Sequence, residues 1–172
     1  MNNWRWHTVE NWIRPLDPVR GAEIGVKEGR FISHLLRAFP DLHMYAVDPW
    51  EQQPAGNEDY AEWNFTTIYQ QYRKAVEPMY ARVTELQMYS IAAARHVSDE
   101  SLDFAFIDAQ HDKASVTMDI MVWLPKIRAG GRLCGHDYVD KPKFRGVVDA
   151  VDGFFGDRVR TGPNDCWMVT VP

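Results

Sequence analysis

Residues 21–29 read Gly-Ala-Glu-Ile-Gly-Val-Lys-Glu-Gly, and this stretch decides how the rest of the chain is organised. Its alternating apolar residues predict a short strand that runs into a turn with glycines at Gly25 and Gly29, followed by a helix from Arg30. Glycine lets a backbone approach a ligand closely. The spacing Glu-x-Gly-x-x-x-Gly differs from the Gly-x-Gly-x-x-Gly loop that holds a pyrophosphate, and the carboxylate of Glu23 suits a cationic ligand instead. The stretch therefore predicts a cofactor loop, with an ordinary strand-to-helix turn as the alternative.

Composition limits the fold classes and partners that the chain can have. The chain has 172 residues, of which 45% are hydrophobic, which predicts one globular domain with a single well-buried core. Its net charge of -5 argues against a nucleic-acid partner, because phosphate contacts need a basic face. Cys134 and Cys166 lie in apolar runs and are expected to be free thiols in a reducing compartment. No segment resembles a signal peptide or a membrane span, so we expect a cytoplasmic protein without a membrane partner.

A carboxylate follows the second apolar run of the chain. The run His-Met-Tyr-Ala-Val leads to Asp48, and Asp48 follows Glu23 by about the interval that a βαβ unit needs. An acid at the carboxyl end of the second strand can accept hydrogen bonds from both ribose hydroxyls of a nucleotide cofactor. The alternative is that Asp-Pro only turns the chain.

Two later runs also end in polar side chains. One apolar run delivers Asp108 and, three residues later, His111; another delivers His136 and Asp137. Ligands of open α/β sheets bind at the carboxyl ends of the strands, so these groups are expected to converge there. Histidines and aspartates at strand ends also cap helices or hold loops, and that alternative stays open here.

Strand and helix patterns alternate along the chain. This predicts an α/β fold with a doubly wound, mostly parallel sheet and helices on both faces. We expect a helical segment over residues 1–20, followed by one domain over residues 21–172. The expected helices span residues 30–38, 60–76, 91–96, 114–127 and 146–155, with a turn at 129–131 before the fifth strand and a closing strand pair at 158–161 and 166–171.

In this order, the signals resemble the class I S-adenosylmethionine-dependent methyltransferases. Residues 21–29 are similar to the first motif of that family, and residues 104–111 and 130–138 are similar to the Ile-Asp-Gly-x-His and Gly-Gly-x-x-x-x-His-Asp-Tyr segments of one branch. That branch contains small-molecule and sugar O-methyltransferases, some of them metal-dependent. The resemblance covers the chain from Gly21 onward and implies a seven-stranded Rossmann-like sheet whose last strand is antiparallel.

The resemblance also implies roles for single residues. Glu23 would face the cationic methionine end of S-adenosylmethionine, Gly25 and Gly29 would shape the loop beside it, and Asp48 would hold the ribose. Tyr89 and Ser90 occupy the place where the family contacts the adenine.

For acceptor activation, Asp108, His136 and Asp137 could hold a divalent ion such as Mg²⁺ or Mn²⁺, which would ease ionisation of an acceptor hydroxyl. Asp108 would also lie beside the cofactor and take part in catalysis. His111 could take the proton, because an imidazole titrates near neutrality. Gln110 stands where related metal-dependent enzymes carry an acid.

The predicted function is transfer of a methyl group to a hydroxyl of a small molecule or sugar. A nicotinamide-dependent oxidoreductase is one alternative, which the glycine spacing disfavours. A non-catalytic binding domain of the same fold is another. The tryptophans near the N-terminus, at positions 4, 6 and 12, are compatible with a homodimer contact.

Overall fold

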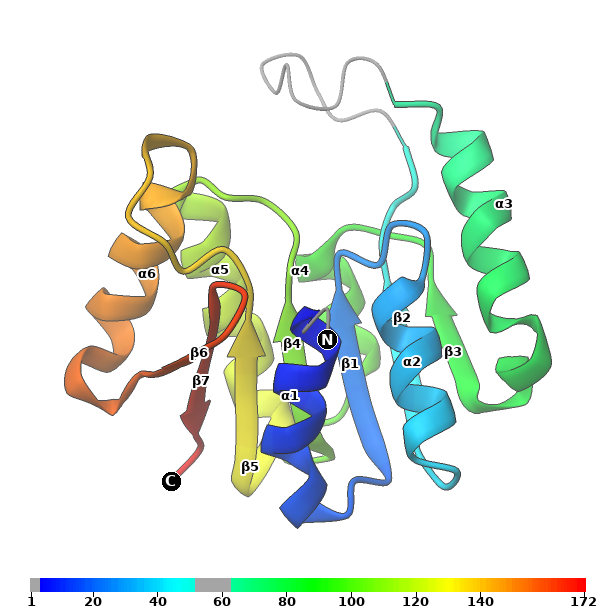
Figure 1. The fold of residues 1–172 in the computed structure, drawn as a ribbon, viewed down its shortest axis with the longest axis horizontal. Helices are drawn as coiled ribbons and strands as arrows, with labels where there is room; N and C mark the ends of the chain where they lie inside the picture. The colour runs from blue at the N-terminus through cyan, green and yellow to red at the C-terminus, as the bar shows by residue number, and fades with distance from the viewer. Residues whose placement is uncertain (1–3, 52–62) are drawn as a thin grey trace.

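The computed structural model describes residues 4–51 and 63–172, which form one central sheet with helices on both faces (Figure 1). The seven strands follow the order β3-β2-β1-β4-β5-β7-β6. Neighbours from β3 to β5 are parallel, whereas β7 is antiparallel to both β5 and β6. This confirms the expected Rossmann-like fold. The strands are β1 (Arg20–Ile24), β2 (His43–Val47), β3 (Val83–Leu86), β4 (Leu102–Ile107), β5 (Ile127–Gly135), β6 (Arg160–Gly162) and β7 (Cys166–Thr170).

Helices divide between the two faces of the sheet. In Figure 1, α1 and α2 lie in front of the sheet, while α4 and α5 lie behind it. The two faces match two hydrophobic clusters, one with α1, α2 and α3 and one with α4, α5 and α6. None of the helices in the described part of the chain is long and apolar enough to cross a membrane. The α-helices are α1 (Arg5–Ile13), α2 (Arg30–Ala38), α3 (Phe65–Val76), α4 (Ser90–Ala93), α5 (Lys113–Trp123) and α6 (Arg145–Phe155).

Side chains of β4 alternate between these two clusters, as a strand buried on both faces requires. Phe104 and Phe106 pack against the α1–α3 side, and Ala105 and Ile107 pack against the α4–α6 side. Phe106 stacks on Phe31 of α2, with ring centroids 4.0 Å apart. The central strand therefore fixes both helical layers at once.

The boundary between α5 and β5 differs from the prediction. The helix ends at Trp123 rather than at 127, a short 3₁₀ turn (Leu124–Lys126) contains Pro125, and β5 already begins at Ile127. Residues 129–131, expected as a turn, lie inside β5 at a register shift against β4. Gly130 has a φ of 77°, which a bulge of this kind needs.

The other predicted elements are found with small changes at their ends. The helix expected from residue 60 begins at Phe65 in the described chain, and residues 60–62 of that prediction lie outside the described residues, as does most of the expected loop 51–59. The N-terminal segment forms α1 and a 3₁₀ turn (Arg14–Leu16) that contains Pro15. Val9 and Ile13 anchor α1 to the sheet, since both are fully buried.

Candidate active site

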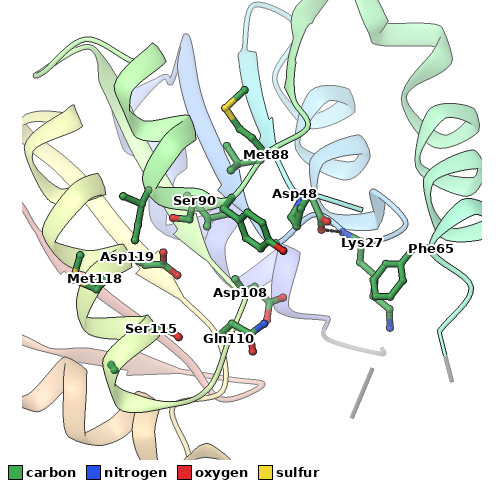
Figure 2. A pocket seen from close by; sticks show the side chains of 18 of the residues that line it. Lys27, Asp48, Phe65, Met88, Ser90, Asp108, Gln110, Ser115, Met118 and Asp119 are labelled. Carbon is green, nitrogen blue, oxygen red and sulfur yellow. Dashed lines mark hydrogen bonds between the residues drawn. The ribbon is translucent and has the colours of Figure 1, made fainter. Parts of the chain in front are cut away.

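A cavity of about 460 Å³ opens at the carboxyl ends of β1, β2 and β4 (Figure 2). The sheet edge forms its floor, the start of α3 bounds one side, and α4 and α5 bound the other. Its lining is mainly apolar, with a few carboxylates, which is the usual character of a small-molecule site. The lining residues are Ile24, Gly25, Lys27, Val47, Asp48, Pro49, Trp63, Phe65, Met88, Tyr89, Ser90, Ile91, Asp108, Ala109, Gln110, Ala114, Ser115, Met118 and Asp119.

Gly25 brings the loop after β1 against the end of β4. Its φ is 90°, and an added Cβ would come within 2.2 Å of the Asp108 carbonyl oxygen. The Gly25 amide donates to the Val47 carbonyl at 2.9 Å, and the Asp108 amide donates to the Ile24 carbonyl at 2.8 Å. Only glycine satisfies both the left-handed backbone and this close approach.

Asp48 holds the same loop from the β2 side. Its Oδ2 accepts hydrogen bonds from the amides of Val26 and Lys27, each at 3.0 Å, and its Oδ1 accepts from the Trp50 amide at 2.7 Å. Burial raises the pKa of Asp48, although the three amide donors oppose that shift. A carboxylate offers about four lone-pair sites, so one remains for a ligand hydroxyl. Asp48 thus lines the cavity where the sequence predicted a ribose-binding acid.

Glu23 lies under the loop, and Gly29 lies beyond it. Glu23 is 1% exposed, and its Oε2 accepts a hydrogen bond from the Ile32 amide in the first turn of α2 at 3.1 Å. Burial raises the pKa of Glu23 well above its usual range, while Arg5 opposes that shift. Gly29 precedes α2 with a φ of 75° and packs against Tyr72. Neither residue is among the cavity-lining residues of the described chain, so direct contact of either one with a cofactor stays a prediction.

At the other end of the cavity, Ser90 joins a polar network that includes Asp119. Ser90 Oγ accepts a hydrogen bond from Trp123 Nε1 at 2.9 Å and itself donates to Asp119. Asp119 is 5% exposed, and burial raises its pKa to about 6. Figure 2 shows Asp119 on the side of the cavity opposite Lys27 and Asp48. Tyr89 is half exposed at the rim, where a hydrogen bond to Glu51 raises the pKa of its hydroxyl.

The predicted acids and histidines converge beside this cavity. His111 Nε2 lies 2.9 Å from Asp137 Oδ2, and His136 Nδ1 lies 3.0 Å from Asp137 Oδ1 and 3.6 Å from Asp108 Oδ1. One ligand atom from each of Asp108, His111 and Asp137 lies within 4.8 Å of the others. We call Asp108, His111, His136 and Asp137 the acid–histidine cluster.

The cluster couples the protonation of its members. Burial acts to lower the pKa of His136, but its contacts with Asp108 and Asp137 overcome this effect and raise that pKa to about 9. Burial acts to raise the pKa of Asp137, but the two histidines hold it below its usual range. Asp137 has a φ of 58°, an uncommon backbone state for a residue other than glycine that aims its carboxylate into the cluster. Because its pKa is raised to about 9, His136 carries a proton at neutral pH.

A cation from the N-terminal helix also reaches the cluster. Arg5 Nε lies 3.0 Å from Asp108 Oδ2, with side chains that are 31% and 11% exposed. The N-terminal end of α1 points to the edge at which the parallel strands end (Figure 1). Arg5 could not be recognised from the sequence, because nothing in the local pattern relates position 5 to position 108.

Asp119 and Lys27 were also missed. Asp119 lies in an apolar helical stretch, where an isolated acid usually faces solvent, and only its burial marks it. Lys27 lies within the glycine loop with a φ of 54°, and its Nζ lies 4.0 Å from the ring centre of Trp63. A charged residue inside the loop could have signalled a ligand contact.

Comparison with known proteins now identifies the family. Residues 22–138, more than half of the chain, match a family model described as a methyltransferase domain. The chain belongs to this methyltransferase family. The match confirms the expected enzyme class, with S-adenosylmethionine as the methyl donor. The matching family is one of methyltransferases and not of nicotinamide-dependent oxidoreductases. No curated protein shows significant sequence similarity to this methyltransferase.

Solved structures agree on the fold. Cofactor-bound Rv0187 from MTB is similar, with a TM-score of 0.72 at 14% identity over 99% of this chain and 81% of that one. The O-methyltransferase TomG from Streptomyces achromogenes, involved in tomaymycin synthesis and solved in complex with SAM, gives 0.68 at 15% identity over 97% of this chain and 78% of that one. At these identities the likeness establishes the methyltransferase fold.

Proposed function

We propose that this methyltransferase transfers the methyl group of S-adenosylmethionine to a hydroxyl of a small molecule or sugar. The observation that carries the proposal is that one cavity of about 460 Å³ is lined by Gly25, Asp48 and Asp108 at one sheet edge. Methyl transfer from a sulfonium to oxygen needs an aligned acceptor, removal of its proton and little else. The cavity would hold the aligned acceptor, and the acid–histidine cluster beside it would take the proton.

The cofactor would lie along the cavity from the glycine loop to α4. Gly25 lines the cavity where the loop after β1 packs against Asp108, and the remaining acceptor capacity of Asp48 suits a ribose hydroxyl. Tyr89 and Ser90 would bound the base, and Asp119 would lie beside it. Asp108 lines the cavity next to Gly25 and would face the sulfonium end, where a carboxylate favours positive charge.

The proton of the acceptor would go to His111. Its Nε2 lies 2.9 Å from Asp137, so a carboxylate orients the ring as in other catalytic base–acid pairs. His136 is a poor base at neutral pH, because its pKa of about 9 keeps it protonated. We therefore assign His136 to balancing the charge of the two carboxylates.

The donor set of the cluster also fits a divalent ion. Carboxylates with an imidazole suit Mg²⁺ or Mn²⁺, and Asp108, Asp137 and one histidine would hold the ion. His111 converges with the two carboxylates, and His136 contacts both of them. A bound ion would lower the pKa of an acceptor hydroxyl.

Two further expectations belong to this proposal. The net charge of -5 favours a small-molecule acceptor over a nucleic acid, and we place the enzyme in the cytoplasm. Trp4 is 47% exposed and stacks on Trp6 with centroids 5.1 Å apart, which is compatible with a homodimer contact.

Calorimetric titration with S-adenosylmethionine and S-adenosylhomocysteine tests the cofactor site. Micromolar binding that weakens at least about tenfold in Asp48→Ala is expected, because the variant loses the ribose acceptor and the loop anchor. Arg37→Ala, on α2 and away from the cavity, is the matched control and should bind normally. Absence of binding by a folded protein would refute the proposal. A screen of hydroxyl acceptors with and without chelator then tests the acceptor and the ion.

A further inference from the structure

Arg5 enters the acid–histidine cluster from outside the sheet. It is the first residue of α1, and its Nε lies 3.0 Å from Asp108 Oδ2. The contact depends on α1 being docked, and several contacts hold the helix there. Thr8 Oγ1 donates to the Pro163 carbonyl at 3.3 Å, and the Cys166 thiol lies 3.9 Å from the Arg5 carbonyl.

The same carboxylate is needed by an ion. Asp108 supplies one of the three convergent ligand atoms, together with His111 and Asp137. A divalent ion sits about 2.1 Å from a carboxylate oxygen. With Arg5 Nε 3.0 Å from Asp108 Oδ2, an ion on that oxygen would lie no more than about 5 Å from the guanidinium. In a largely buried site, where screening is weak, that repulsion is strong.

We infer that Arg5 and a divalent ion exclude one another at Asp108, so that docking of α1 determines whether the cluster holds a metal. The inference rests on the proposed function of this cluster as the site of acceptor activation. With α1 docked, the guanidinium supplies the positive charge beside Asp108. Arg5 is thus a positioning residue that acts through Asp108.

Thermodynamic linkage makes the inference reciprocal. If docked Arg5 weakens ion binding by some factor, a bound ion must weaken the docking of α1 by the same factor. Two independent measurements therefore test one quantity. One follows the ion, and the other follows the helix.

The first measurement titrates Mn²⁺ alone into the full chain and follows the free ion by electron paramagnetic resonance. Arg5→Gln is expected to bind Mn²⁺ at least about tenfold more tightly than the unaltered protein. Arg5→Lys keeps a cation and should stay near the unaltered affinity. Arg14→Gln is the matched control, because Arg14 is exposed, pairs with Glu10 and follows the same helix. The double variant Arg5→Gln with Asp108→Asn should lose the gain in Mn²⁺ affinity that Arg5→Gln shows alone.

The second measurement uses the unaltered protein and therefore does not depend on the variants folding. Hydrogen exchange of the α1 amides should speed up when Mn²⁺ is added at saturating concentration, while exchange in α2 should stay unchanged. Equal Mn²⁺ affinity in the unaltered protein and Arg5→Gln would overturn the inference, as would unchanged α1 exchange in the presence of bound ion. Absence of Mn²⁺ binding in every variant would also overturn it. The cofactor titration would still judge the proposed function separately in each case.

Discussion

The stability of the fold should depend on the protonation of His136. Replacing His136 with Asn removes the imidazolium that lies between Asp108 and Asp137. The two carboxylates raise the pKa of His136 from 6.5 to about 9, against the effect of burial. Each pKa unit corresponds to about 1.4 kcal/mol, so the charged ring contributes on the order of 3 kcal/mol to the free energy of unfolding.

The pH window follows from the direction of the shift. Because the folded pKa is raised, this contribution is fully present below the unfolded value of 6.5 and is lost as the pH rises through about 9. Urea unfolding is measured with chelator present from about pH 6 to about pH 10. Over this range the free energy of unfolding should fall by about 3 kcal/mol more in the unaltered protein than in His136→Asn. The variant should be the less stable of the two mainly at the acidic end.

His43 provides a control of the opposite sign. Burial, with Arg20 and Arg82, lowers the pKa of His43, so its contribution to stability is lost as the pH falls below 6.5. His43→Asn should therefore change the acidic limb and leave the alkaline limb alone. Parallel curves for the unaltered protein and His136→Asn above neutrality would refute the reasoning, because the charged ring would then contribute nothing to folding.

Three further changes test the cavity. Gly25→Ala should destabilise the fold by about 2 kcal/mol or more in thermal melts, because its Cβ would meet the Asp108 carbonyl at 2.2 Å on a left-handed backbone. Gly153 is an exposed position of α6 where an added Cβ meets no other atom, so Gly153→Ala should be neutral or stabilising. Asp48→Asn should weaken cofactor binding in calorimetry more than it destabilises the chain, since its one amide oxygen can still accept from two loop amides but has no lone pair left for a ligand hydroxyl; equal free-energy losses in binding and in unfolding would contradict this. Burial raises the pKa of Asp119 from 3.8 to about 6, so ionisation of Asp119 destabilises the fold as the pH rises. In urea unfolding, the free energy of unfolding of Asp119→Asn should rise by about 3 kcal/mol relative to the unaltered protein between about pH 4 and pH 7. A difference that does not change with pH would contradict the shift.

The succession of strands and helices along the chain and the acids at the strand ends were predictable from the sequence, because both depend on local patterns. An apolar run of strand length buries itself in the sheet, and the first polar residue after it must then lie at the sheet edge. Asp48, Asp108 and His136 follow this rule, with Asp137 next to His136, and they lie at that edge. Their lateral arrangement then follows from parallel pairing of β1 with β2 and β4, and of β4 with β5.

The α5–β5 boundary was not predictable, because its glycines serve the strand rather than a turn. Gly130 and Gly131 punctuate the sequence, yet β5 runs through both. An added Cβ on Gly131 would meet the Asp103 carbonyl at 2.7 Å, so the residue is glycine to let two strands approach at a bulge. A turn and a bulge make the same demand on residue type.

The direction of the Glu23 side chain follows from the alternation along β1 rather than from the motif, and contact of Glu23 with the cofactor stays a prediction. Its neighbours Ala22 and Ile24 face the α4–α6 side. Glu23 therefore points to the opposite side, where the α2 amide of Ile32 meets it. A motif gives the residue type, whereas the pleat decides which layer receives the side chain.

The groups that surround each acid come from helices that no strand-end pattern describes. Asp108 and Asp119 both line the cavity, yet Asp108 contacts Arg5 of α1, whereas Asp119 lies against Ser90 and has a pKa raised by burial to about 6. Desolvation makes a buried carboxylate such as Asp119 take up a proton more easily. The sheet edge thus places both acids at the cavity, and α1 and the α4–α5 layer supply the groups that surround them. This is why changing Arg5, far from Asp108 in the sequence, should alter what Asp108 can bind.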